Sequence, residues 1–201
     1  MKLFICLFLV FLSSFNFDYK KREMPYPIVI AKADLIVDGT VSKVSKNTYE
    51  FKVDQFVKGK SNSRINVVIW KEWLCDPRMK ELKPGQRLIL FLKRNAFGTF
   101  YSINDSTGEL YIDNDNFINI FIAKDFVNPT IFKEGVKMFL KTFTACGDFN
   151  DRFFGDGYFL SNKSIFEIYK MEEDNQVFKY LVDRQMNYSN IQYSTTLQFS
   201  N

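Results

Sequence analysis

Apolar and polar residues alternate along several short stretches of this chain, which is the pattern of β-strands with one buried face. In residues 35–42, Leu35, Val37, Gly39 and Val41 alternate with the polar residues Asp38, Thr40 and Ser42. The alternation is cleaner in residues 49–58, and a polar turn separates the two stretches, which predicts an antiparallel pair. Shorter strands are predicted further along the chain, at residues 65–70, 99–103, 109–112 and 117–122.

Two features indicate that these strands form a small barrel. Residues 87–93, RLILFLK, are apolar on both faces, which favours a central strand or one covered by a helix. Gly39 interrupts the first strand, and barrels use glycine where a strand bends or where two backbones approach closely. We therefore expect Gly39 at a bend, with its apolar neighbours pointing inward.

Helices are predicted on both sides of the strand-rich region. A short helical turn is expected at residues 28–33. Asn128 and Pro129 supply a capping residue followed by proline at the first helical position, and an apolar stripe then runs to about Thr144. The remaining expectations are a loop at residues 147–158, a helix at 164–185 that the segment KMEEDNQ interrupts, and an alternating edge strand at 191–199.

The predicted fold class is mainly β with α. A small antiparallel β-barrel is followed by a mostly helical C-terminal portion. We expect the barrel domain to occupy residues 18–127, and residues 128–201 to form a helical extension packed on it. The 201 residues and the 46% apolar content are enough to bury a core of ordinary size.

Residues 1–17 have the layout of a secretory signal peptide, which changes the expected compartment. Lys2 precedes an apolar run that ends before Ser13 and Ser14. A membrane-spanning helix needs about 20 apolar residues, so export is favoured over an uncleaved anchor. We expect a periplasmic or secreted chain that is not an integral membrane protein after signal cleavage.

Export makes the cysteines informative. Cys6 would leave with the signal peptide, so Cys75 and Cys146 would remain as an even pair in an oxidising compartment. A disulfide between them would close a loop of about 70 residues and stabilise the fold by roughly 4 kcal/mol. Two separate buried thiols are the alternative, because sequence does not place the two Cα atoms within bridging distance.

The composition excludes several kinds of chemistry. The chain contains no histidine, so Ser-His-Asp and Cys-His nucleophilic systems and the common His-bearing zinc sites are excluded. The net charge of +4 is small and spread along the sequence. A nucleic-acid partner is therefore not expected, since such proteins carry a concentrated basic face.

The strand pattern also carries a recognisable set of residues. It reads Ala33-Asp34-Leu35-Ile36-Val37-x-Gly39-x-Val41, then Phe51-x-Val53 with Val57-Lys58-Gly59, Ile65-x-Val67, Cys75, and Leu82-x-x-Gly85-x-x-Leu88-Ile89-Leu90-Phe91. This pattern resembles the netrin-like domain shared by tissue inhibitors of metalloproteinases and their bacterial relatives. The resemblance covers about residues 28–112 and implies a secreted, OB-type five-stranded barrel.

The resemblance has one chemical departure. Inhibitors of that family begin the mature chain with Cys-x-Cys, whose free amine and carbonyl chelate the protease zinc. No cysteine lies between Cys6 and Cys75 here, so that wedge is absent. A shared fold then does not imply a shared function.

The candidate ligand face consists of Trp70, Trp73 and Tyr101, because OB-type barrels bind oligosaccharides and oligonucleotides on stacking aromatic rings. The alternative is that these rings pack under the C-terminal helix. Lys58-Gly59-Lys60 is interpreted as a turn with solvated lysines rather than as an anion site.

Two acidic stretches could suggest calcium loops, but neither fits. The stretch that starts at Asp113 has Ile118 and Lys124 where an EF-hand needs glycine and glutamate. The stretch that starts at Asp148 has Phe153 and Phe159 there. No catalytic residue, metal or cofactor is assigned.

These observations favour an exported, non-catalytic binding protein that recognises a protein or a glycan at the cell envelope. Inhibition of an extracellular metalloprotease is an alternative that rests on the family resemblance. A carboxylate-based hydrolase is a second alternative. It would need two convergent acids in a cleft, and the spacing of Asp and Glu picks out no pair.

Overall fold

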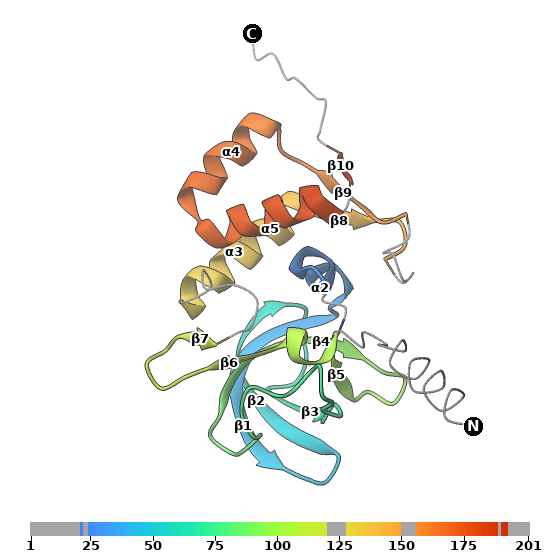
Figure 1. Cartoon of the computed structure of the whole chain (residues 1–201), viewed down its shortest axis with the longest axis vertical. Coiled ribbons are helices and arrows are strands. Elements are labelled where there is room, and N and C mark those ends of the chain that lie inside the picture. The colour runs from blue at the N-terminus through green and yellow to red at the C-terminus, as the bar shows by residue number, and fades with distance from the viewer. Residues whose placement is uncertain (1–20, 22–23, 120–127, 150–155, 189, 193–201) are drawn as a thin grey trace, which may run out of the picture.

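The structure is a computed structural model, shown in Figure 1, and it describes residues 21, 24–119, 128–149, 156–188 and 190–192. The predicted signal peptide at 1–17 lies outside the described residues. A β-barrel occupies one half of the molecule and a helical layer the other, with the short helix α2 (Tyr26–Lys32) between them. Among the described residues, no helix has the length and apolar character needed to cross a membrane.

Five strands close the barrel in the order β1-β2-β3-β5-β4, and β4 pairs back with β1. Their bounds are Leu35–Val44 for β1, Thr48–Lys58 for β2, Arg64–Val68 for β3, Arg87–Arg94 for β4 and Phe100–Ser102 for β5. Two further strands, β6 (Glu109–Ile112) and β7 (Ile118–Asn119), extend the sheet from β4. The closed barrel is compatible with the OB-type barrel that the resemblance implies.

The barrel is mixed, so the expectation of an antiparallel barrel is wrong for one pair of strands. β3 and β5 run parallel, with Val67 opposite Phe100, while the other neighbouring pairs of the ring are antiparallel. The reason is geometric. Strands that alternate in direction around a closed ring must be even in number, so a ring of five contains a parallel pair.

Gly39 lies where the backbones of β1 and β2 approach closely, as the sequence predicts. A Cβ atom at this position would lie 2.1 Å from the carbonyl oxygen of Lys52, and the register of the two strands shifts between Asp38 and Gly39. The alternating residues on either side point inward. Together with residues of the other strands they fill the barrel: Leu35, Val37, Val41, Tyr49, Phe51, Val53, Ile65, Val67, Leu88, Leu90, Leu92 and Phe100.

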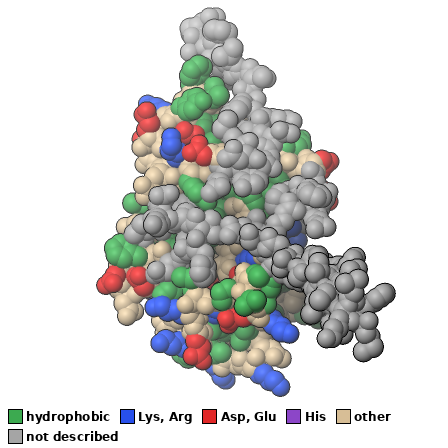
Figure 2. All heavy atoms as spheres, in the orientation of Figure 1, with side chains coloured by type: hydrophobic (Ala, Val, Ile, Leu, Met, Phe, Trp, Pro, Cys, Tyr) green, Lys and Arg blue, Asp and Glu red, His purple; other side chains and the backbone are tan. Residues whose placement is uncertain are grey.

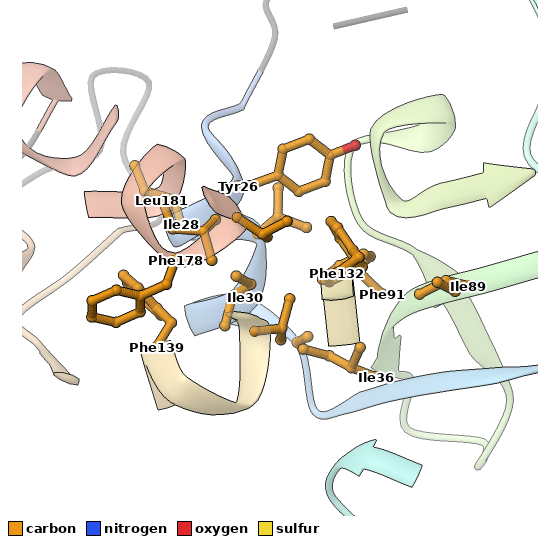
Figure 3. Close-up of a cluster of buried hydrophobic side chains, with 14 of the residues drawn as sticks. Tyr26, Ile28, Ile30, Ile36, Ile89, Phe91, Phe132, Phe139, Phe178 and Leu181 are labelled. Atoms are coloured by element: carbon orange, nitrogen blue, oxygen red, sulfur yellow. The ribbon is translucent and has the colours of Figure 1, made fainter. Parts of the chain in front are cut away.

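Strand β4 is buried on both faces, which confirms the interpretation of residues 87–93. Leu88, Leu90 and Leu92 point into the barrel, whereas Ile89 and Phe91 point outward into a second core. Figure 3 shows this second core, where residues of α2 lie between β4 and the C-terminal helices. The rings of Tyr26, Phe91 and Phe132 meet there, with centroids 5.8 to 6.4 Å apart.

Helix α3 (Pro129–Thr142) begins as the sequence predicts. The Asn128 side chain accepts hydrogen bonds from the backbone N–H groups of Thr130 and Ile131. The helix ends two residues before the predicted Thr144, because Phe143 adopts extended backbone and starts strand β8. An ion pair ties α3 to the barrel, since Lys133 Nζ lies 2.5 Å from the buried carboxylate of Asp38 on β1.

The predicted interruption of the last helical region is also confirmed. Helix α4 (Ile165–Asp174) starts with a capping box between Ser164 and Glu167. Asn175 then separates it from α5 (Gln176–Tyr188), and its side-chain oxygen accepts hydrogen bonds from the backbone N–H groups of Val177 and Phe178.

A second small sheet joins β8 (Phe143–Cys146), β9 (Tyr158–Ser161) and β10 (Asn190–Gln192). β8 begins where the sequence predicts the end of a helix. β9 begins at the last residue of the loop predicted at 147–158. β10 coincides with the start of the edge strand predicted at 191–199, and the rest of that strand lies outside the described residues. β10 pairs in parallel with β9, a contact between distant segments that local sequence does not specify.

Candidate binding site

A buried polar cluster joins the barrel to the long β3–β4 loop. Trp70 follows β3, Arg78 lies in the loop, and Glu109 is the first residue of β6, directly after the 3₁₀ helix η1 (Asp105–Gly108). Gly108 allows the tight turn into β6, since a Cβ atom there would lie 2.5 Å from the carbonyl oxygen of Ile103. Long-range folding therefore brings these three side chains together.

Glu109 is the centre of the cluster. Its Oε1 accepts a hydrogen bond from Arg78 Nε at 2.7 Å. Its Oε2 accepts from Trp70 Nε1 at 3.2 Å and from the hydroxyl of Tyr49 at 3.3 Å. The Glu109 side chain is only 4% exposed, and a buried carboxylate needs such donors because it has lost its hydration.

Arg78 provides the compensating positive charge. Its guanidinium lies 4.2 Å from the centre of the Trp70 ring, and Nη1 donates to Glu72 at 3.2 Å. Burial opposes the charge of this guanidinium, but the hydrogen bond and the negative charge of Glu109 outweigh that effect and raise the pKa of Arg78. Burial, together with the charge of Glu109, also raises the pKa of the Tyr49 hydroxyl well above its usual value. Tyr49 therefore stays a neutral donor.

One donor of this cluster remains free. Arg78 Nη2 is buried and has no hydrogen-bond partner among the described residues. The side chain of Arg78 also lines a pocket of about 10 Å³ that opens to the surface. The pocket is lined by side chains of the loop, η1 and the neighbouring strands: Trp70, Arg78, Met79, Lys80, Gln86, Leu88, Ser106, Glu109 and Tyr111.

A second ion pair supports one wall of the pocket. The carboxylate of Asp76 is buried and lies 2.8 Å from Lys21 Nζ. Asp76 also accepts a hydrogen bond from the hydroxyl of Ser106, which lines the pocket. Burial and the nearby charge of Asp76 raise the pKa of Asp105. These contacts hold η1 against the β3–β4 loop.

The predicted ligand face is only partly available at the surface. Trp70 is 7% exposed, its indole N–H is bonded to Glu109, and Arg78 covers one face of its ring. Trp73 and Tyr101 remain 41% and 39% exposed. Trp70 therefore lines the pocket, and its ring is not free to stack on a ligand.

The predicted disulfide is not formed, because Cys75 and Cys146 are both free thiols in the structure. Cys75 lies in the turn where Trp73 and Asp76 pair, and Cys146 ends β8 in the second sheet. The two cysteines thus belong to separate parts of the fold, which the sequence does not show.

The interpretation of Lys58 as a solvated lysine is also wrong. Its ammonium donates to the carbonyl oxygens of Ile30 and Ala31 at the end of α2, where it satisfies helix carbonyls that lack a partner within the helix. Burial lowers the pKa of Lys58, although the charge of Asp34 counteracts this shift. Lys60, in contrast, is exposed.

The predicted hairpin turn at Asp113 is formed. The side chain of Asp113 accepts a hydrogen bond from the backbone N–H of Phe117, and Asn116 has a positive φ of 62°, as expected for a tight turn. The stretch that starts at Asp148 lies partly outside the described residues. Among the residues that the structure describes, no three His, Cys, Asp or Glu side chains gather into a metal-binding group.

Arg78 and Glu109 are the site residues that sequence patterns miss. Glu109 offers a weak signal, because it is a charged residue at the start of a short, otherwise apolar strand. Arg78 offers none, since it lies in a long polar loop. On the face shown in Figure 2, acidic side chains lie between basic ones around the barrel.

No protein-family model matches this sequence, and no curated protein is similar enough to count as a relative. The proposed function therefore rests on the geometry of the pocket.

Proposed function

We propose that this chain is an exported, non-catalytic binding protein that recognises a protein or a glycan at the cell envelope. The observation that carries the proposal is the pocket lined by Trp70, Arg78 and Lys80, which opens to the surface. A concave site lined by aromatic rings and a few polar groups is the usual form of a ligand-binding site.

The state of Glu109 supports a binding role over a catalytic one. Both of its oxygens already accept hydrogen bonds, one of them from the guanidinium of Arg78. A general acid must exchange a proton with the substrate near the working pH. A carboxylate held by a guanidinium, an indole and a phenol is suited to positioning Arg78 instead.

The two glycines of the proposed OB-like, netrin-like pattern support the finer description of the fold. Gly39 allows the close approach of β1 and β2. Gly59 has a φ of +73°, and a Cβ atom there would lie 2.3 Å from the carbonyl oxygen of Asp34. Both positions therefore need glycine for a structural reason. A five-stranded barrel is also the architecture of OB-fold proteins, which use their surface to bind ligands.

The function is tested by partner capture from envelope extract. The exported chain, immobilised on a matrix, should retain at least one component, and Lys80→Glu at the mouth of the pocket should lose it. Lys46→Glu makes the same change of charge on an exposed turn that does not line the pocket, so it should retain the component. Recovery of nothing above the bare matrix would contradict the proposal.

Two further assays address compartment and the alternative activity. Fusion of residues 1–25 to a reporter that is active only after export should give activity, and a silent reporter would contradict export. The purified chain should leave metalloprotease activity unchanged at micromolar concentration. Inhibition at that concentration would favour the inhibitor alternative.

A further inference from the structure

A small hairpin in the β3–β4 loop exposes a leucine at its tip. The backbones of Trp73 and Asp76 pair, and the N–H of Asp76 donates to the carbonyl oxygen of Trp73 at 2.9 Å. Leu74 and Cys75 occupy the two positions between them. Leu74 is 95% exposed, and Trp73 beside it is 41% exposed. Tight turns usually carry glycine, asparagine, aspartate or serine at such positions, so an apolar tip needs an explanation.

Two ion pairs anchor this hairpin to the rest of the chain. At its base, Glu72 accepts hydrogen bonds from the backbone N–H of Arg78 at 3.0 Å and from Nη1 of the same residue at 3.2 Å. Nearer the tip, the buried carboxylate of Asp76 pairs with Lys21 and accepts from the hydroxyl of Ser106. The fold therefore holds the apolar tip at the surface.

Apolar and basic side chains surround the tip. Met79 lies at the base of the hairpin and is 37% exposed. Lys71 and Lys80 flank the base on its two sides, both are exposed, and neither forms an ion pair among the described residues. Exposed Glu81 follows Lys80, whereas both carboxylates of the hairpin itself are in the ion pairs above. The rim of the tip is therefore more basic than acidic.

The hairpin also lies close to the N-terminal apolar run. Lys21 Nζ is 2.8 Å from the carboxylate of Asp76, and the run predicted as a signal peptide ends at residue 17. A chain spans at most about 3.6 Å per residue, so the end of the run lies within about 14 Å of the Cα atom of Lys21. Any membrane contact of this run therefore brings the hairpin within reach of the same lipid surface.

A lipid surface suits this tip better than a protein surface does. The tip is a two-residue turn that projects side chains outward, and a bilayer accepts a protruding apolar side chain without a matching pocket. Tryptophan is enriched at the headgroup level of membranes, where lysine also places its charged end. Protein interfaces, in contrast, are depleted in lysine.

We propose that this hairpin inserts Leu74 and Trp73 into the surface of a phospholipid bilayer and holds the exported chain there as a peripheral protein. Lys71 and Lys80 then lie at the level of the lipid phosphates. The inference goes beyond the proposed function, because it concerns the surface on which the chain lies and not the ligand of the pocket.

Vesicle binding tests this contact. The exported chain should co-sediment with vesicles made of equal parts of phosphatidylcholine and phosphatidylglycerol. Leu74→Asp should weaken this binding by at least about tenfold, because it replaces the apolar tip with a charge. Phe97→Asp is the matched control and should leave the binding unchanged, since Phe97 is 92% exposed on a different turn, between β4 and β5. No co-sedimentation, or an equal loss in the two variants, would overturn the proposal.

Trp73 reports the insertion directly. Its side chain is 41% exposed whereas Trp70 is 7% exposed, and the chain contains two tryptophans. Transfer of an exposed indole from water into a lipid surface shifts its fluorescence emission to shorter wavelength. Vesicles should produce this shift, and Trp73→Phe should remove the shift while it retains most of the binding. A shift that persists in Trp73→Phe would come from Trp70 and would overturn the proposal.

A protein contact at the same tip is a distinct outcome. If vesicles do not bind the chain and Leu74→Asp loses the component captured from envelope extract, the tip docks on a protein and the proposal is overturned.

The pocket and the tip can fail separately. Loss of the captured component with Lys80→Glu, combined with no vesicle binding, would support the proposed function and refute the membrane contact. Vesicle binding that Leu74→Asp weakens, without any captured component, would support the membrane contact and contradict the proposed function.

Discussion

Replacing Glu109 with glutamine tests whether the cluster around Arg78 is held together by charge. The substitution keeps the size of the side chain but removes its negative charge. The structure predicts a large effect, because the side chains of Glu109 and Arg78 are only 4% and 6% exposed and are joined at 2.7 Å. The amide group would also direct donors toward a site where Arg78 and Trp70 already donate.

The expected cost follows from the remaining charges. Without Glu109, Arg78 keeps only Glu72 as an ionic partner, and the side chain of Glu72 is 49% exposed. Breaking a buried ion pair by removing one partner costs about 3–5 kcal/mol. Removing the exposed partner by Glu72→Gln should cost less than about 1 kcal/mol. Glu72→Gln is therefore the matched control for Glu109→Gln.

Urea unfolding, followed by circular dichroism, measures both costs. With a denaturant slope of about 2 kcal/mol/M, Glu109→Gln should lower the midpoint by about 2 M. The double variant Arg78→Met with Glu109→Gln should recover part of the loss, since it leaves no uncompensated buried charge. If Glu109→Gln costs no more than Glu72→Gln, the reasoning about the buried pair is refuted.

Three further substitutions test the fold by the same unfolding measurement. Gly39→Ala should lower the free energy of unfolding by about 3 kcal/mol, because its Cβ would overlap the Lys52 carbonyl, and a neutral effect would contradict the close approach. Asn128→Ala should cost about 1 kcal/mol through the lost cap of α3, whereas Asn128→Asp should cost little. Glu167→Gln should destabilise at pH 7 but not at pH 2. Hydrogen bonds from Ser164 and Lys163 lower the pKa of Glu167 to about 2, so its contribution is present above pH 4.5 and is lost as the pH falls through 2. A deficit that persists at pH 2 would contradict this assignment.

The candidate site shows where sequence patterns stop being informative. Trp70 was among the residues expected at a ligand face, but the structure makes it a buried wall of the pocket. Arg78 and Glu109 stand 31 positions apart, and their pairing depends on how the β3–β4 loop folds over β6. A contact between residues this far apart produces no periodic pattern in the sequence. The residues next to each partner therefore do not indicate the pairing.

The sequence by itself determined the local elements. Period-two alternation set the barrel strands, the Asn128–Pro129 pair set the start of α3, and a glycine marked the close approach in β1. These signals depend on backbone conformation and on one buried face, which neighbouring residues specify.

Only the tertiary structure decided how the elements meet. Ring closure with an odd number of strands requires a parallel pair, which the structure places at β3–β5, and the second sheet joins β9 to the distant β10. The same three-dimensional packing keeps Cys75 and Cys146 unbonded and places Lys58 on the end of α2. These contacts join segments that are remote in the sequence, so the local spacing of residues does not specify them.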